Sequence, residues 1–546
     1  MAQLISSFAF LVVLLRAAIL CLQTVAVGGV IFFAAVARRS EQRNDDLIRS
    51  AWGLIRYSAL GLALAELFFI ITNSLVLSYS GEIPLQNVLG ANFVSAGALG
   101  MAGAVALVGW PQTWRKNLGL LPLLPAAMII TASVLTSHSA SRVEGRWFLM
   151  TLTALHYIAT AAWIGALPCL LLARKRIADD QPKEEVLRGF SRLAQISVAV
   201  LFLAGLGMSW KLVGSWDALY GTAYGVMLSA KIVLFGVLLL LGSANFFIVR
   251  GVITPWTAGA TSLLRFGEVE IGIGLSVILA AASMTSQPPG ADLTGDRVSL
   301  HEIAERYKPR LPRLTSPALK EITPSTEQMA KDAASTGKAL PVAFVSSAAG
   351  INIDTPADRA WSEYNHNVAG LVVFLMGLLA LFSRSRYFSW AKIWPLAFLL
   401  LALFLFFRAD PENWPMGPNG FWESFAVTDV LQHRAAVLLI IVFAVFQYCV
   451  ETGRVKSAGA ALVFPAVCAL GGVVLLTHTH ALVNIKEELL AELSHTPLAV
   501  LGIIAGWSRW LELRLPQQNG SRRYLAWVWP VCFILVGLVL MDYHEM

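Results

Sequence analysis

The chain has 546 residues, of which 57% are hydrophobic and only 14% are charged, and its formal net charge is +7. Soluble domains average about 25% charged residues, so this composition, with a mean hydropathy of +0.66, excludes an ordinary soluble globular protein. The positive charge does not indicate nucleic-acid binding, because the basic residues cluster in short loops between apolar runs, where they are membrane-topology signals.

Apolar runs of membrane-spanning length predict helices along most of the chain. The first run lacks a basic leader and a small-residue cleavage site, so we interpret it as a transmembrane helix and not as a signal peptide. Helices are predicted near residues 8–36, 53–79, 89–109, 118–136, 148–173, 192–213, 222–249 and 264–285, and then near 366–383, 391–408, 434–451, 458–477, 496–512 and 524–541. The expected fold class is an all-α polytopic membrane protein. It would have about fourteen transmembrane helices, roughly eight in a first bundle and six in a second, joined by an outward-facing segment.

Alternate short loops are rich in Lys and Arg, for example WRKN at 114–117, SRSRYFSWAK at 383–392 and ETGRVK at 451–456. Loops of this kind stay in the cytoplasm. Both termini and the polar segment between the bundles are therefore expected to face outward. The five cysteines are isolated and form no CxxC motif, so we expect neither a disulfide framework nor a thiolate metal cluster.

On this topology all nine histidines fall on or near the outer side of the membrane. One interfacial histidine is commonly a polar cap or a headgroup contact. The whole set on one side favours metal ligation, because neutral imidazole is the commonest side-chain metal ligand. We predict a first site from His138 and His156. A second site is predicted from His366, His433, His478, His480 and His495.

Two details refine these sites. His478 and His480 can share a metal only where the chain is extended, since residues i and i+2 diverge on a helix. Five methionines also lie near the outer side or in its loops: Met150, Met208, Met227, Met284 and Met416. Thioether together with imidazole suits copper, and Cu(I) especially, although the routine role of methionine is packing.

Segment 150–171, MTLTALHYIATAAWIGALPCLL, resembles the central helix of the CopD family of bacterial copper-resistance membrane proteins. The family pattern has a His, a small-residue stretch and then Trp-Ile/Leu-Gly-Gly-Leu. His156, Trp163 and Gly165 match it, and Ala166 replaces the second glycine. The resemblance continues, in family order, through SHSA at 137–140 and the stretches 190–215, 218–247 and 265–289.

The resemblance implies copper handling at the bacterial cytoplasmic membrane, commonly uptake from the periplasm. It implies His138 and His156 as candidate ligands, with Met150 and Met284 as weaker ones. The chain then divides into N-terminal transmembrane helices at 1–134, a CopD-like domain at 135–290, a periplasmic segment at 291–364 and a six-helix domain at 365–546. This last domain resembles C-terminal extensions on some longer relatives.

Five ionisable residues lie within predicted spans: Arg16, Glu66, Lys231, Glu268 and Glu270. Charges in lipid are expensive, so such residues pair or line a polar path. We predict pairs between Arg16 and Glu66 and between Lys231 and Glu268 or Glu270, and a role in an ion or proton route is the alternative.

The leading hypothesis is a copper transporter of the bacterial inner membrane, with Cu(I) or Cu(II) as the bound ion. We expect no enzymatic activity and no nucleic-acid partner; membrane lipid and a periplasmic copper-binding protein are the partners considered. No ATP-binding GxxxxGK[ST] motif is present. One alternative is a membrane haem or quinone redox protein, since paired histidines also ligate haem. Another is a copper sensor or chaperone that binds the ion without moving it.

Overall fold

The computed structural model contains helices and no strand in the residues that it describes. These are 8–38, 45–81, 83–110, 120–176, 180–250, 256–285, 287–295, 297–322, 355–422, 425, 428–477, 486–517 and 519–545. Ten helices in this part of the chain are long and apolar enough to cross a membrane, and two shorter apolar helices accompany them. The all-α, multi-pass prediction is therefore confirmed, whereas the count of fourteen spans in two bundles stays a prediction.

The chain separates into two compact units. Unit 1 comprises Met1–Val298 with Val473–Leu489, and unit 2 comprises Ser299–Gly472 with Leu490–Met546. His138, His156 and Met284 belong to unit 1. His366, His433 and His495 belong to unit 2. Contacts among these six residues can therefore be examined inside a single unit for each set.

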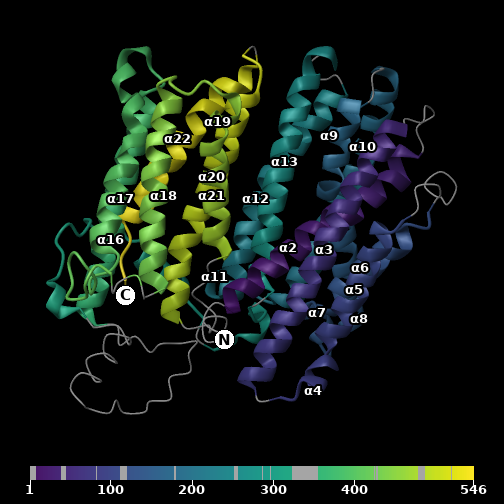
Figure 1. Cartoon of the computed structure of the whole chain (residues 1–546), viewed down its shortest axis with the longest axis horizontal. Helices are drawn as coiled ribbons and strands as arrows, with labels where there is room; N and C mark the ends of the chain where they lie inside the picture. The colour runs from purple at the N-terminus through teal and green to yellow at the C-terminus, as the bar shows by residue number, and fades with distance from the viewer. Residues whose placement is uncertain are drawn as a thin grey trace. The chain divides into compact units, whose positions relative to one another are not determined.

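Unit 1 is a bundle organised around its first helix (Figure 1). Its main elements are α2 (Phe8–Phe32), η1 (Phe33–Ala37), α3 (Asp45–Ser80), α5 (Asn92–Val108), α6 (Leu123–Leu135), α7 (His138–Ser141), α8 (Arg146–Thr160), η3 (Ala161–Gly165), α9 (Leu167–Arg176), α10 (Asp180–Leu212), α11 (Trp216–Gly221), α12 (Ala223–Val249) and α13 (Trp256–Met284). Helix α2 packs against α3, η3 and α13, while α5 packs against α3 and α6. The first span is 67% buried, more than any other of the ten, so α2 is the central helix of this unit.

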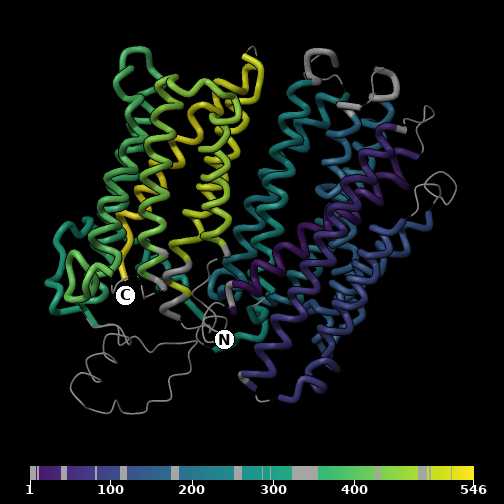
Figure 2. Tube along the Cα trace, viewed as in Figure 1, coloured from purple at the N-terminus to yellow at the C-terminus, as the bar shows by residue number. Residues whose placement is uncertain are grey.

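Helix α2 approaches η3 very closely in unit 1. Figure 2 shows the Cα trace of this unit, in which α8, η3 and α9 follow one another along the chain. Here η3 is a π-helical turn, a feature that often marks functional sites. A Cβ on Gly165 would lie 1.9 Å from the backbone oxygen of Thr24, and a Cβ on Gly28 would lie 2.3 Å from the oxygen of Ala161. Only glycine fits at either position with the backbones this close.

Unit 2 packs its helices around aromatic side chains. Its main elements are α14 (Leu300–Arg306), α16 (Pro356–Phe382), η6 (Arg386–Leu396), α17 (Ala397–Arg408), α18 (Thr428–Glu451), α19 (Ala458–Ala461), α20 (Val463–Thr477), α21 (Lys486–Arg514) and α22 (Gly520–Met541). Only the first part of α20 and the last part of α21 belong to this unit. Helix α16 packs along α22, and α17 packs against α18. Trp394, Phe464 and Trp529 are almost fully buried, and their ring centroids lie 5.0 to 5.3 Å apart. These rings form the core of the unit.

Unit 2 contains a buried ionic cluster around Glu512. Glu512 accepts hydrogen bonds from Arg384 Nη1 at 2.6 Å, Arg509 Nη1 at 2.7 Å and Trp529 Nε1 at 3.0 Å. Arg509 also donates to Glu451 at 3.0 Å. The Glu512 side chain is only 10% exposed. Glu512 and Glu451 together therefore balance the charges of two guanidinium groups that have little access to water.

Candidate functional site

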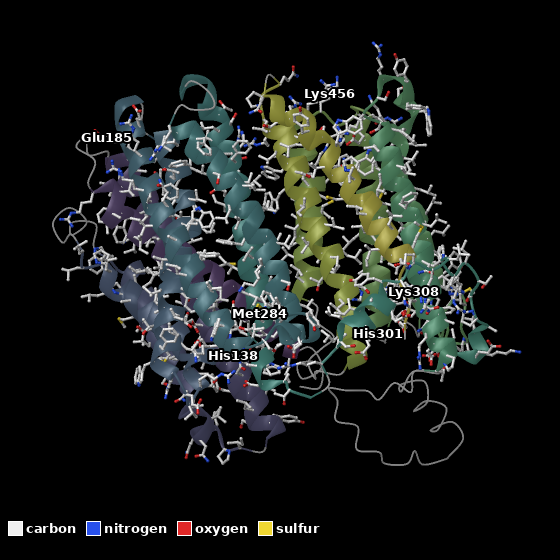
Figure 3. All side chains as sticks on the ribbon, turned by 180° about the vertical axis from the view of Figure 1, so that it is seen from behind. His138, Glu185, Met284, His301, Lys308 and Lys456 are labelled. Carbon is white, nitrogen blue, oxygen red and sulfur yellow. The ribbon has the colours of Figure 1, made fainter. Side chains whose placement is uncertain are left out.

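His138 opens the short helix α7 at one end of unit 1. Its position is fixed locally, because Ser139 Oγ lies 2.7 Å from Thr153 Oγ1 and so joins α7 to α8. Arg142 then donates two hydrogen bonds to Asp292, at 2.7 and 2.9 Å. Figure 3 shows His138 close to Met284, the last residue of α13. The two residues meet in a hydrogen bond between the His138 Nε2 atom and the Met284 carbonyl oxygen at 3.3 Å.

The partner of His138 fixes its tautomer. A carbonyl oxygen only accepts hydrogen bonds, so Nε2 carries the hydrogen and Nδ1 keeps its lone pair. Burial lowers the pKa of His138; the Met284 hydrogen bond and Asp292 oppose this shift, and the positive charges of Arg16 and Arg142 add to it. The imidazole is therefore neutral at physiological pH. A neutral imidazole with one oriented N–H is the form in which histidine binds metal ions.

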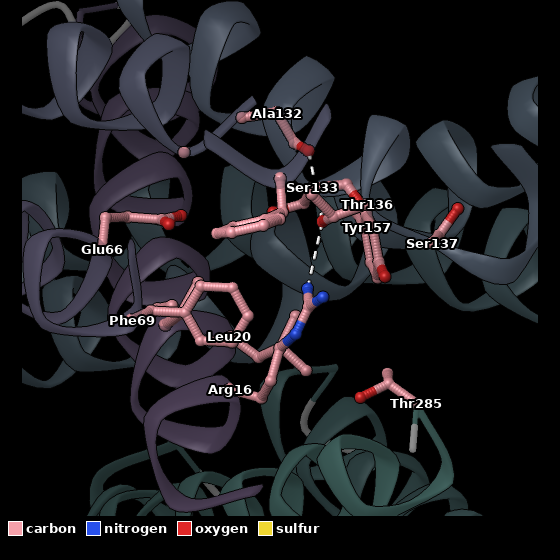
Figure 4. A pocket seen from close by; sticks show the side chains of 13 residues that line it. Arg16, Leu20, Glu66, Phe69, Ala132, Ser133, Thr136, Ser137, Tyr157 and Thr285 are labelled. Atoms are coloured by element: carbon pink, nitrogen blue, oxygen red, sulfur yellow. Dashed lines mark hydrogen bonds between the residues drawn. The ribbon is translucent and has the colours of Figure 1, made fainter. Parts of the chain in front are cut away.

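A small polar pocket lies directly behind this contact. It has a volume of about 20 Å³, enough for one or two water molecules. Ser137 and Thr285, the chain neighbours of His138 and Met284, line it together with Arg16 and Glu66 (Figure 4). The remaining lining residues are Ile19, Leu20, Phe69, Phe93, Gly97, Ala132, Ser133, Thr136 and Tyr157. The His138–Met284 contact therefore adjoins a buried polar chamber.

The predicted ion pair between Arg16 and Glu66 is not formed. Figure 4 shows the Arg16 guanidinium directed to Thr136, to which Nη1 donates at 3.0 Å, and it also lies 4.7 Å from the Phe69 ring centroid. Glu66 is only 7% exposed, and its carboxylate faces Gly97 and Gly100, where Cβ atoms would lie 3.3 and 3.2 Å from it. The two residues share the pocket without direct contact, because hydroxyl and aromatic partners take up the guanidinium.

The pairing predicted for Lys231 is also wrong. Glu268 pairs with Arg265 on its own helix. Glu270 is 2% exposed and accepts hydrogen bonds from Asn245 Nδ2 at 2.5 Å and from Trp163 Nε1 at 3.3 Å. Amide and indole donors thus satisfy this carboxylate in place of an ammonium group.

His156 lies apart from the His138–Met284 contact. It sits about 15 Å along α8 from Arg146 and faces Gly205 of α10, where a Cβ would be 3.8 Å from its ring. Its Nδ1 atom is buried and has no hydrogen-bond partner among the described residues. Lys231 interacts with it electrostatically, so a cation at His156 would meet a positive charge. The orphan nitrogen keeps His156 a candidate ligand, but a less favourable one than His138.

The candidate thioethers differ in position. Met284 is 6% exposed at the end of α13, beside His138, whereas Met150 is half-buried in the second turn of α8. Met208 lies near the same place, because Thr153 Oγ1, the partner of Ser139, is 3.9 Å from its Sδ atom. Met284 is therefore the methionine whose backbone directly contacts a candidate histidine.

A larger pocket of about 450 Å³ opens elsewhere in unit 1. Apolar side chains, many of them leucine and phenylalanine from α9, α10, α12 and α13, form most of its wall, and Glu270, Asn245 and Gln195 are among its polar groups. Asn245 Oδ1 is buried without a hydrogen-bond partner in the described part of the chain. An apolar cavity with a few convergent polar groups is the usual form of a small-molecule site.

The second predicted site is only partly assembled. His366 of α16 and His495 of α21 have ring centroids 6.1 Å apart. His433 instead lies 2.8 Å from Asp410 through Nδ1. His478 and His480 lie outside the described residues. Among the residues that are described, no group of three or more His, Cys, Asp or Glu side chains is arranged to hold a metal ion.

Sequence reasoning did not identify several side chains that contact the candidate histidines or line the small pocket. Tyr543 stacks on His366 at a centroid distance of 4.0 Å, and Asp410 pairs with His433. Thr136 and Tyr157 line the small pocket beside Arg16. The sequence TLTALHY at 151–157 places Tyr157 next to a candidate histidine, and this adjacency was a usable signal. The sequence carries no comparable sign for Tyr543 or Asp410.

Comparison with known proteins identifies the segment around these helices. Residues 184–284 match the family model described as "Copper resistance protein D". "Copper transport protein CutJ" from Bacillus subtilis (strain 168) is 31% identical over 170 residues, which cover 31% of this chain and 30% of the relative. "Copper resistance protein D" from Pseudomonas syringae pv. tomato is 27% identical over 280 residues, covering 46% of this chain and 88% of the relative. No solved structure matches the chain.

The matched segment has clear limits. It covers α10, α12 and α13 and ends at Met284. His138 and His156 precede it, and the histidines of unit 2 follow it. The chain spans less than a third of the length of the first relative, so the activity of that whole protein does not transfer directly.

Proposed function

This chain carries a CopD-family segment at residues 184–284, and from that premise we propose that it binds copper at the outer end of unit 1 and transports it across the bacterial cytoplasmic membrane. The observation that carries the proposal is the contact between His138 Nε2 and the Met284 carbonyl at 3.3 Å. In this contact the neutral His138 imidazole, whose Nδ1 atom has a lone pair, meets Met284, the last residue of the matched segment. The names of both relatives, a copper transport protein and a copper resistance protein, support copper as the ion.

The chemistry of the donors favours Cu(I). Imidazole nitrogen and thioether sulfur suit soft monovalent copper, whereas Mg²⁺ and Ca²⁺ prefer oxygen ligands. In the proposal, His138 Nδ1 and the Met284 thioether capture the ion. The polar pocket of Arg16, Glu66 and Thr136 then receives it, and Glu66 supplies the negative charge that a cation needs in a low-dielectric interior. The function proposed is movement of the ion without catalysis.

We expect His138→Ala to weaken copper binding at this place at least about tenfold, which corresponds to about 1.4 kcal/mol. The measurement is an anaerobic Cu(I) titration of the full chain in detergent against a chromophoric chelator. His301→Ala is the matched control, because His301 is exposed at the start of α14 and should leave the affinity unchanged. Equal Cu(I) affinities of the wild type and His138→Ala would contradict the assignment.

Redox chemistry with a quinone is a second candidate function. It is favoured by the 450 Å³ pocket in which Glu270 and Asn245 meet an apolar wall. A quinone would place its ring carbonyls toward these polar groups and its tail against the leucines. Extraction of the purified protein with organic solvent tests this candidate: stoichiometric quinone that is lost in Asn245→Leu would support it, and extracts without quinone would remove it.

A further inference from the structure

Two histidines of unit 2 lie in a geometry that the copper site of unit 1 does not explain. We propose that His366 and His495 hold a second copper(I) ion between them, an inference that rests on the proposed copper function. His366 comes from the third turn of α16, and His495 comes from α21. Both belong to unit 2, and both lie outside the segment that matches the CopD family.

The ring geometry fits one shared ion. Metal bonds to imidazole nitrogen are about 2.0 Å long, so two imidazoles on opposite sides of one ion have ring centroids roughly 6 Å apart. The observed separation of 6.1 Å and the 60° angle between the ring planes agree with this arrangement. The angle also excludes face-to-face stacking of the two histidines.

His366 is already oriented as a metal ligand. Its Nδ1 atom lies 2.8 Å from the Ser362 carbonyl oxygen, which only accepts hydrogen bonds, so Nδ1 carries the hydrogen. The lone pair is then on Nε2. A backbone carbonyl that holds the other ring nitrogen is the usual outer-shell partner of a metal-bound histidine. Tyr543 covers the face of the ring at 4.0 Å, which leaves the in-plane lone pair open.

Tyr543 is a positioning residue and not a ligand. Its hydroxyl donates a hydrogen bond to Glu545 at 2.9 Å. Asn367, one residue after His366, donates to the Tyr543 carbonyl at 2.8 Å. The C-terminal residues are thus tied to α16 where His366 projects, and the ring of Tyr543 fixes the orientation of the imidazole.

The donor set selects Cu(I) among the common metals. Structural Zn²⁺ takes four ligands, and Ca²⁺ takes six or more oxygens, but among the described residues no third His, Cys, Asp or Glu side chain is arranged with these two to hold a metal ion. Two imidazole nitrogens suffice for monovalent copper. Charge agrees with this choice: the Arg306 guanidinium lies 4.5 Å from the Tyr543 ring centroid and the Glu545 carboxylate offsets it, so a monovalent ion costs less than a divalent one.

A cavity lies beside the two histidines. It has a volume of about 410 Å³ and is lined by Ser494, the neighbour of His495, and by Tyr543. Arg306, Arg310 and Asp542 also line it, and the Arg310 backbone nitrogen donates a hydrogen bond to Asp542 at 3.0 Å. The cavity therefore brings solvent-accessible space to the chain neighbour of one histidine and to the ring that covers the other.

The test counts copper on the full chain in detergent. We expect the wild type to hold about two Cu(I) ions per chain and His366→Asn or His495→Asn to hold about one, because each site supplies too few ligands to tolerate a loss. His301→Asn is the matched control, since His301 is exposed at the start of α14 and should keep the stoichiometry. Size-exclusion profiles of every variant exclude misfolding as the cause of a lower count.

A second measurement leaves His366 and His495 unaltered. In His138→Ala, X-ray absorption of the remaining copper should show a two-coordinate shell of nitrogen without sulfur. Sulfur in that shell, or an unchanged copper count in His366→Asn and His495→Asn, would overturn this second site while leaving the first intact. A wild type that binds no copper would instead refute the proposed function, and a Soret band with stoichiometric iron would show that the two histidines ligate haem.

Discussion

Replacing Glu512 with alanine is expected to lower the melting temperature of unit 2 by on the order of 10 °C. The carboxylate accepts hydrogen bonds from Arg384 and Arg509 at 2.6 and 2.7 Å, and the two arginine side chains are only 19% and 9% exposed. Removing one partner of a buried ion pair leaves an uncompensated charge and costs about 3–5 kcal/mol. For a unit of this size, 1 kcal/mol corresponds to about 2–4 °C.

The control for this prediction is an ion pair of similar length at the surface. Arg188 and Glu184 lie 2.6 Å apart, with side chains 66% and 41% exposed. Exposed pairs contribute about 0–1 kcal/mol, so Glu184→Ala should shift the midpoint by no more than about 3 °C. Thermal unfolding in detergent, followed by tryptophan fluorescence, measures both variants. Equal shifts in the two variants would show that the Glu512 cluster is not buried as described.

The second large effect is expected at Gly165. A Cβ there would lie 1.9 Å from the Thr24 oxygen, and this oxygen belongs to a backbone that cannot rotate away. Overpacking of this kind typically costs about 1–3 kcal/mol and sometimes more. Gly165→Ala should therefore separate α2 from η3 and lower the thermal midpoint of unit 1 by several degrees.

Gly53→Ala is the matched control for the glycine prediction. Gly53 lies in α3, and a Cβ there would meet nothing within 4 Å. This change should leave the melting temperature unchanged or raise it slightly, because alanine favours helix more than glycine does. A midpoint for Gly165→Ala that equals that of Gly53→Ala would contradict the close packing of α2 on η3.

Apolar runs made the membrane-spanning helices predictable, because a bilayer demands about twenty consecutive apolar residues per helix. The predicted helix at 222–249, for example, corresponds to α12 at Ala223–Val249. Boundaries were less predictable where charged turns extend a helix beyond the apolar run. The predicted 192–213 helix thus begins at Asp180 as α10, twelve residues earlier.

The candidate sites were predictable as residue types but not as contacts. His138 with Met284, and His366 with His495, were named in advance as members of two sets, and the structure brings each of these pairs together. Partners far away along the chain were not foreseen. Thr136 is 120 residues away from Arg16 in the sequence, yet its hydroxyl accepts a hydrogen bond from the Arg16 guanidinium. A hydroxyl at the same depth in the bundle is a better partner than a more distant carboxylate. No local sequence pattern encodes that depth.

The measurement that tests the central claim most directly is copper uptake into vesicles. Purified protein is placed in liposomes that contain a Cu(I)-responsive chelator, and Cu(I) is added outside. The account predicts a protein-dependent rise in the lumenal signal that falls at least about tenfold in His138→Ala and persists in His301→Ala. A signal equal to that of protein-free vesicles, from a protein that binds copper in detergent, would contradict transport and leave copper binding alone as the function.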